Sequence, residues 1–118
     1  MRQEISNAVI VFLFAATCAL GPNATLATER GHASTLNFVY PLGTGDFILA
    51  FDNDSAQCTA LGPPKYMYVS VGQNGVTAEG AKKMFATAML AFALRKQLSV
   101  AFDDSTSACF INRLTVYN

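Results

Sequence analysis

The segment TAEGAKKMFATAMLAFALRKQ, Thr77–Gln97, followed at once by LSVAF, Leu98–Phe102, decides the fold of this chain. The first part predicts one helix over Thr77–Lys96. Thr77 is a suitable N-cap residue, and Glu79 places an acid in the first turn, where the helix dipole favours it. The basic residues at the other end supply the charge that a helix C-terminus favours. The second part alternates apolar and other residues and predicts a strand.

Short alternating segments on both sides of this helix predict further strands. They lie at Thr35–Tyr40, Asp46–Phe51, Lys65–Val71 and Phe110–Tyr117. The alternation predicts which residues share an inner face. These sets are Leu36, Phe38 and Tyr40 in the first strand, and Phe110, Asn112, Leu114 and Val116 in the last. The polar stretch Thr28–Ser34 shows no such pattern, and we expect it to be frayed.

The resulting element order is three strands, one helix and two strands. A lone helix between the third and fourth strands is the connectivity of a five-stranded Greek-key barrel, the OB-fold. The expected class is therefore mainly β with one α-helix, arranged as an OB-fold-like barrel. A five-stranded sheet with one helix packed on it is the alternative.

The N-terminal segment 1–27 has the pattern of a signal peptide. An apolar run over Ala8–Leu20 is too short to span a bilayer, which needs about 20 residues. We expect cleavage after Ala27, a folded domain over 28–118, and no membrane span after cleavage. A lipoprotein cysteine at Cys18 and an uncleaved anchor are the alternatives.

After this cleavage the cysteines Cys58 and Cys109 remain. An even pair in an exported chain predicts a disulfide, with two free buried thiols as the alternative. These cysteines and the distant His32 do not form a metal ligand set, and no cofactor motif is present. The formal net charge of zero argues against nucleic-acid binding, which depends on neutralising phosphates.

The predicted helix carries more apolar surface than one domain needs to bury. One stripe should cover the sheet, and it comprises Ala81, Met84, Phe85, Ala88, Met89 and Phe92. Leu90 and Leu94 lie on the opposite side, where a surface helix usually carries charge. Either these leucines meet neighbouring copies of the chain, or an exposed alanine-rich helix simply tolerates them.

The segment from Cys58 to Tyr117 resembles B subunits of the subtilase-cytotoxin and pertussis-like A–B toxins, and small secreted bacterial proteins related to them. The resemblance rests on Cys58, the helix segment quoted above, LSVAF, and the turn DDSTSAC that leads into FINRLTVY. Cys109 matches by position the cysteine that precedes the last strand in that group.

This resemblance implies an OB-fold, export, a Cys58–Cys109 bond, a ring whose helices line a pore, and binding of host glycans. It also implies a toxin A subunit as a partner. The chain departs from the group in having no tryptophan, and no sugar-binding motif can be carried over residue by residue.

The outward row of the third predicted strand, Tyr66, Tyr68 and Ser70, is the candidate binding surface, because aromatic faces stack on sugars and on partner chains. The alternative is an ordinary amphipathic row. Two acidic turns are weaker candidates. Asp52–Ser55 has oxygen ligands for calcium or sugar hydroxyls, and Asp103 with Asp104 has the carboxylates of an acid–base pair. Both are more typical of solvated turns.

No catalytic site emerges from the sequence. His32 is the only histidine, and the motifs of serine hydrolases, phosphate loops and zinc proteases are missing. The sequence thus predicts a secreted or periplasmic, non-catalytic binding module that is homo-oligomeric and binds glycans. The alternatives are a monomeric periplasmic interaction or inhibitor protein, and a small secreted hydrolase that uses His32.

Overall fold

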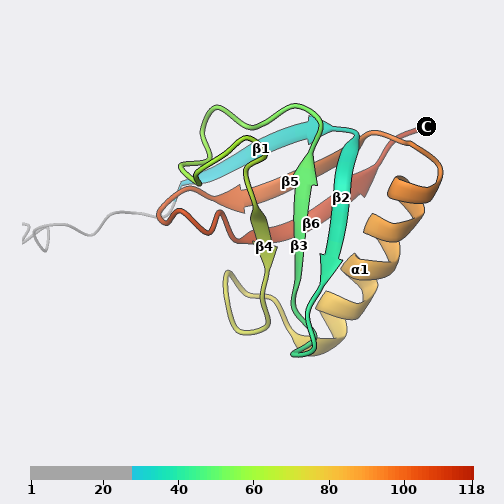
Figure 1. The fold of residues 1–118 in the computed structure, drawn as a ribbon. Helices are drawn as coiled ribbons and strands as arrows, with labels where there is room; N and C mark the ends of the chain where they lie inside the picture. Colours follow the sequence, from blue (N-terminus) through green and yellow to red (C-terminus); the bar gives the residue numbers. More distant parts are fainter. Residues whose placement is uncertain (1–27) are drawn as a thin grey trace, which may run out of the picture.

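A computed structural model describes residues 28–118, so the expected signal segment 1–27, with its cleavage site and Cys18, lies outside the described residues. The class is mainly β with one α-helix, as the sequence predicts (Figure 1). The elements in chain order are β1 (Glu29–Ser34), β2 (Leu36–Pro41), β3 (Phe47–Phe51), β4 (Met67–Val69), α1 (Ala78–Ala93), β5 (Leu98–Asp103) and β6 (Ile111–Val116).

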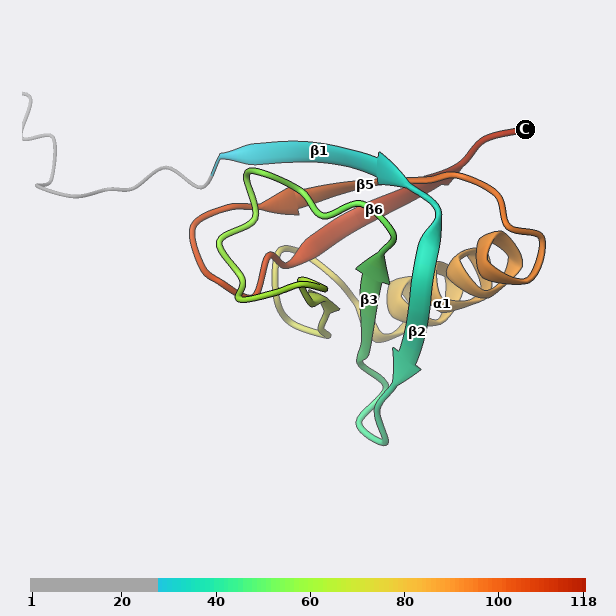
Figure 2. The same cartoon turned by 45° about the horizontal axis from the view of Figure 1, so that its top comes forward.

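The strands form two antiparallel three-stranded sheets, with the orders β1-β5-β6 and β2-β3-β4. Within residues 28–118 both sheets are open, and no closed barrel is formed. Thr35 alone separates β1 from β2, so the chain passes directly from one sheet to the other. Figure 2 shows β1 and β2 running in different directions on either side of this bend.

The expectation that Thr28–Ser34 is frayed is wrong. Residues 29–34 form β1, which pairs with β5 in an unbroken register from Glu29↔Asp103 to Ser34↔Leu98. Most of its side chains are exposed. The segment therefore lacks the apolar alternation of a half-buried strand. Backbone hydrogen bonds to β5 hold β1 in the sheet instead.

The faces expected for the strand at 35–40 are also partly wrong. Leu36 pairs with Phe51 and Phe38 pairs with Ala50, so Asn37 is an extra residue in a β-bulge. The bulge reverses the alternation. Leu36 is buried in the core, whereas Phe38 lies on the opposite face with Tyr40.

A second bulge changes the last strand in the same way. Ala101 pairs with Arg113 and Phe102 pairs with Ile111, which leaves Asn112 as the extra residue. Ile111 is fully buried, whereas Phe110, which was expected to face inward, lies before β6 and is only half-buried. Leu114 and Val116, beyond the bulge, pack against the core as expected.

Helix α1 begins as predicted, because the Thr77 hydroxyl accepts a hydrogen bond from the Gly80 N–H at 3.0 Å. It ends at Ala93, earlier than expected, and its last turn contains no basic residue. Arg95 lies beyond the helix with φ 51°, and its guanidinium donates to the Leu36 carbonyl at 3.0 Å. Its role is thus to join the helix end to β2 rather than to offset the helix dipole.

The helix packs against β2 and β6 through a face of small and larger apolar residues. Ala81, Ala88 and Ala91 are buried, and Met84, Phe85 and Phe92 pack against the core. Met89, which was expected in this buried stripe, is 40% exposed.

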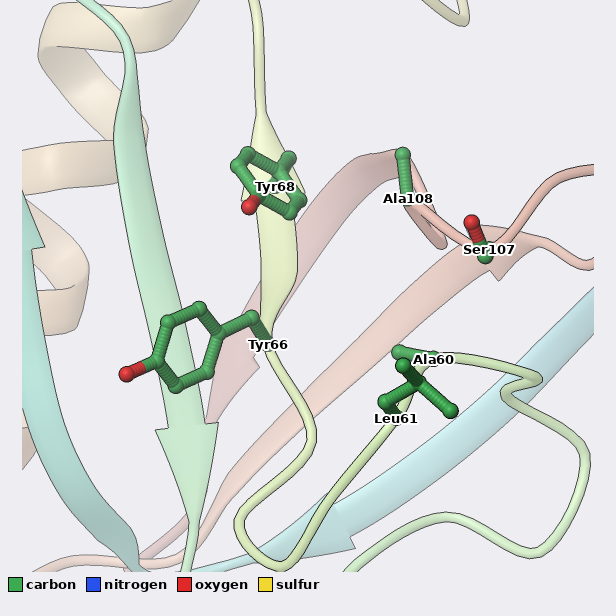
Figure 3. A pocket seen from close by; sticks show the side chains of 6 residues that line it. All are labelled: Ala60, Leu61, Tyr66, Tyr68, Ser107 and Ala108. Atoms are coloured by element: carbon green, nitrogen blue, oxygen red, sulfur yellow. The ribbon is translucent and has the colours of Figure 1, made fainter.

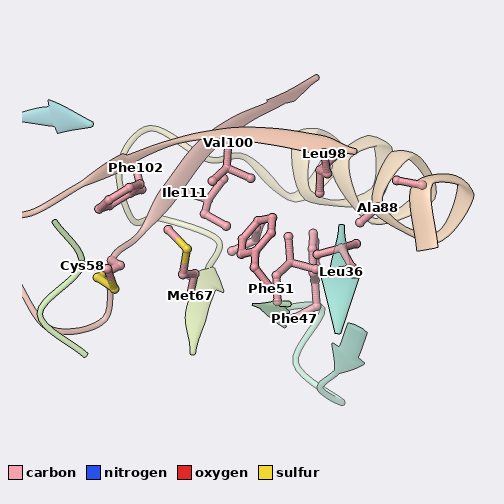
Figure 4. Close-up of a cluster of buried hydrophobic side chains, with 14 of the residues drawn as sticks. Leu36, Phe47, Phe51, Cys58, Met67, Ala88, Leu98, Val100, Phe102 and Ile111 are labelled. Carbon is pink, nitrogen blue, oxygen red and sulfur yellow. A yellow bond between two sulfur atoms is a disulfide. The ribbon is translucent and has the colours of Figure 1, made fainter. Parts of the chain in front are cut away.

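One hydrophobic core lies between the two sheets and the helix (Figure 4). Phe47, Leu49 and Met67 from one sheet meet Val100 and Phe102 from the other. The predicted disulfide is present at the edge of this core. Cys58 and Cys109 are both buried, their Cα atoms lie 5.8 Å apart, and they join the loop after β3 to the turn before β6.

Candidate functional site

The outer face of the sheet β2-β3-β4 presents a group of aromatic side chains. Tyr40 and Tyr68 lie opposite Ile48 from the two neighbouring strands, and Phe38 lies opposite Ala50. Residues in register share a face of a sheet, so these side chains point away from Leu49 and the core. Phe38, Tyr40, Tyr66 and Tyr68 form what we call the aromatic face.

The aromatic face combines buried residues of the central strand with exposed tyrosine rings. Ile48 and Ala50 of the central strand are buried, at 5% and 0% exposure, although they point away from the core. Tyr40 and Tyr66 remain 55% and 42% exposed. This combination leaves ring surface available to a ligand above a closely packed floor.

Tyr66 is held in position by Phe38. The two rings meet edge to face, with centroids 5.3 Å apart and an interplanar angle of 89°. This is a favoured geometry for an aromatic pair. It spans the sheet, because Phe38 lies on β2 and Tyr66 precedes β4.

Two depressions meet at Tyr66. One has a volume of about 380 Å³ and is lined by Ala60, Leu61, Tyr66, Tyr68, Ser107 and Ala108 (Figure 3). The other, of about 390 Å³, is lined by Phe38, Val39, Tyr40 and Tyr66. Both are mainly apolar, with hydroxyl groups at Ser107 and on the tyrosines. Such surfaces suit ligands with an apolar ring face and polar edges.

The structure brings together two of the three residues in the predicted binding row. Tyr66 and Tyr68 line the first depression, whereas Ser70 lines neither. Strand β4 ends at Val69, and the Ser70 carbonyl accepts the Gln73 N–H at 3.1 Å in the following turn.

Three other residues of this surface were not singled out from the sequence. The alternation places Phe38 and Tyr40 on the inner face, because the bulge at Asn37 leaves no signal in the sequence. Leu61 is 94% exposed and lies just before Gly62-Pro63-Pro64. An apolar residue beside such a turn is the one sequence feature by which Leu61 could have been found.

The acidic loop at Asp52–Ser55 serves the fold. The Asp52 carboxylate accepts the Thr35 hydroxyl at 2.5 Å, Asn37 Nδ2 at 3.4 Å and Arg95 Nη2 at 3.3 Å. The hydrogen bond from Thr35, followed by those from Asn37 and the charge of Arg95, lowers the pKa of Asp52. The neighbouring Asp54 carboxylate accepts the backbone N–H of Lys65 at 2.9 Å.

The other acidic turn is similarly occupied. Asp104 forms an ion pair with Arg30 at 2.8 Å, and Asp103 Oδ1 accepts the Ser105 N–H at 2.8 Å. His32 Nε2 lies 2.6 Å from the carbonyl oxygen of Asn53 and is the donor of this hydrogen bond, because a carbonyl oxygen can only accept. Within residues 28–118, no group of three or more His, Cys, Asp and Glu side chains is arranged to hold a metal ion.

A second apolar surface lies on α1. Leu90 and Leu94 are 54% and 57% exposed, and they lie one turn apart beside the 40% exposed Met89. We call these three residues the helix face.

No protein-family model matches the chain, and no curated protein matches it significantly. No helix within residues 28–118 is long and apolar enough to cross a membrane.

Proposed function

We propose that this chain is a secreted, non-catalytic binding module that holds a glycan against its aromatic face. The observation that carries the proposal is the exposure of Tyr40 and Tyr66 above a packed sheet, with depressions on both sides of Tyr66. Sugar rings have apolar faces that stack on aromatic rings, and hydroxyl groups that reach the polar edges of such a surface.

The placement of the titratable side chains supports binding rather than catalysis. His32, Asp52 and Asp104 each bond to a group that fixes the fold. None of them lines the depressions beside the aromatic face.

The disulfide supports a location outside the cytoplasm. Disulfides persist in oxidising compartments, and this one is consistent with the predicted export signal. We therefore place the chain in the periplasm or the extracellular medium.

The connectivity supports an OB-like arrangement and, with it, the likeness to toxin B subunits. Strands β1 and β2 correspond to two halves of one bent strand, which restores the expected order of three strands, a helix and two strands. The other edges of the sheets approach where the Tyr68 N–H donates to the Ala108 carbonyl at 3.2 Å. On this interpretation the open sheets are the two sides of an OB-like barrel.

Intrinsic fluorescence tests the glycan proposal directly. The chain has four tyrosines and no tryptophan, and Tyr40, Tyr66 and Tyr68 all lie on the aromatic face. We expect a glycan found by array screening to change tyrosine fluorescence. Tyr66→Ala should weaken binding about tenfold, or about 1.4 kcal/mol, through loss of stacking.

Tyr117→Ala is the matched control, because Tyr117 is 49% exposed but lines a depression of the other sheet. Its affinity should equal that of the unmodified protein. An array without any bound glycan, or equal losses in the two variants, contradicts the proposal.

The helix face supports homo-oligomer formation, and an assembled form is also what a catalytic partner subunit of the toxin type would require. Leu90→Lys with Leu94→Lys should dissociate the oligomer, because burying ammonium groups in an apolar contact is unfavourable. Size-exclusion chromatography with light scattering measures the result.

Leu61→Lys is the control for this test, since it adds a charge at an exposed leucine outside the helix. A protein that is monomeric before mutation favours the alternative, a monomeric periplasmic interaction or inhibitor protein.

A further inference from the structure

The outer edge of β1 carries unpaired backbone groups. The Asp104 N–H donates to the Thr28 carbonyl at 3.2 Å, and the register from Glu29 to Ser34 is regular. Antiparallel pairing then directs the backbone groups of alternate residues toward β5, namely Arg30, His32 and Ser34. Those of Glu29, Gly31 and Ala33 point outward, and no hydrogen bond within residues 28–118 reaches them.

This edge is open to a partner. Glu29, Gly31 and Ala33 are all exposed. The next outward group along the chain is already paired, because the Thr35 carbonyl accepts the Asp52 N–H at 2.9 Å. An added strand would continue a ladder that the protein itself begins.

Gly31 has no evident role in the fold of one chain. Its φ is not in the positive range, and an added Cβ would meet only the Val100 carbonyl oxygen at 4.0 Å, an ordinary contact. A glycine within a strand weakens it, and it often marks close approach of another backbone.

The edge has only part of the usual protection against pairing. Proteins block exposed edges with charged side chains, especially lysine, and with proline, bulges or inward-pointing charges. Residues 29–34, ERGHAS, contain no proline or lysine, and the β1–β5 register shows no bulge. The charged side chains Glu29 and Arg30 are already paired, with Arg113 and Asp104.

We propose that β1 pairs antiparallel with β1 of a second copy of this chain, about a two-fold axis at Gly31. Gly31 then lies opposite Gly31 of the partner subunit, and Glu29 opposite Ala33 of the partner subunit. Both of these are hydrogen-bonded positions, so every outward donor meets an acceptor. The two sheets β1-β5-β6 join into one continuous sheet.

A second copy fits this edge because the pattern of free groups is symmetric about Gly31. One two-fold operation satisfies both chains with the same surface, as in most soluble dimers. A single strand edge buries less than the ~1,200 Å² of a standard interface, so we expect weak, concentration-dependent association. This surface is separate from the helix face and from the aromatic face.

Amide hydrogen exchange followed by NMR tests the pairing residue by residue. Raising the protein concentration should slow exchange several-fold at Glu29, Gly31 and Ala33. Exchange at Arg30, His32 and Ser34 should stay unchanged, because β5 already protects those amides. Sedimentation velocity should show the sedimentation coefficient rising over the same concentration range.

Gly31→Lys should abolish both effects by placing two ammonium groups at the axis, while far-UV circular dichroism stays unchanged. Gly43→Lys is the matched control, since a Cβ at Gly43 meets nothing within 4 Å and its φ is also not positive. That control should associate like the unmodified protein.

The experiment is repeated in the Leu90→Lys, Leu94→Lys background, which removes any association through the helix face. Persistence of the effects there supports the β1 dimer, and its result is independent of glycan binding. Exchange rates that do not depend on concentration, or association unaffected by Gly31→Lys, overturn it.

Discussion

Asp52 joins three parts of the molecule through one carboxylate. Its donors come from Thr35 between the sheets, Asn37 at the β2 bulge and Arg95 after the helix. Arg95 also donates to the Leu36 carbonyl, so the helix end is fixed at the bend between β1 and β2. An aspartate that looks like a turn residue in the sequence thus stabilises the junction of the sheets.

We predict a measurable acid dependence from Asp52. Its pKa is lowered in the folded state, chiefly by the Thr35 hydroxyl. The stabilisation is therefore present above the unfolded carboxyl pKa of about 4, and is lost as the pH falls through the folded value. Asp52→Asn should flatten the fall of the urea midpoint on acidification below about pH 4.

Thr35→Val serves as the companion variant, because it removes the largest cause of the shift and should raise the pKa of Asp52 toward its ordinary value. In the Asp52→Asn background it should leave the pH dependence unchanged. Parallel acid profiles for the unmodified protein and Asp52→Asn would contradict this account.

The elements differ in how closely their structure follows the pattern in their sequence. Helix α1 depends on local signals, and its N-cap at Thr77 formed as predicted. The alternation in β2 and β6 is local too, but it holds only on either side of a bulge. Asn37 and Asn112 are the extra residues. Each reverses the alternation between the two parts of its own strand.

A double-mutant cycle examines the helix N-terminus. Thr77→Ala should lower the free energy of unfolding by about 1 kcal/mol through loss of the cap. Gly80→Ala should add up to about 1 kcal/mol from helix propensity in the Thr77→Ala background. It should add less in the unmodified protein, because the new Cβ would lie 3.1 Å from the Thr77 hydroxyl oxygen.

Urea unfolding of the single and double variants measures this coupling. Equal effects of Gly80→Ala in the two backgrounds would show that the capping hydroxyl moves aside freely.

The whole molecule depends on joining segments that are distant in the chain. The disulfide links residues 51 positions apart, from the irregular loop after β3 to the turn before β6. It also fixes the loop that carries Leu61 beside Tyr66 and Tyr68. The bond therefore contributes to the candidate site as well as to stability.

Replacing both cysteines by alanine should lower the free energy of unfolding by about 4 kcal/mol, the entropic value for a loop of this length. That is a large share of the about 5–15 kcal/mol typical of a domain. Urea unfolding of the double variant and of the reduced protein should agree. A loss below about 1 kcal/mol would show that the unfolded chain is already restricted in this region.

The sequence alone determined the helix and its cap, the positions of most strands, and the cysteine pair, and it pointed to Tyr66 and Tyr68. These depend on local propensity, capping and composition, which neighbouring residues carry. Only the tertiary structure decided that β1 is a strand, that the bulges turn Phe38 and Tyr40 outward, and that these rings join Tyr66. The first of these outcomes depends on pairing with β5, about 70 positions away, and the others depend on the register between β2 and the strands beside it. Pairing and register are not encoded in the apolar alternation of a single segment.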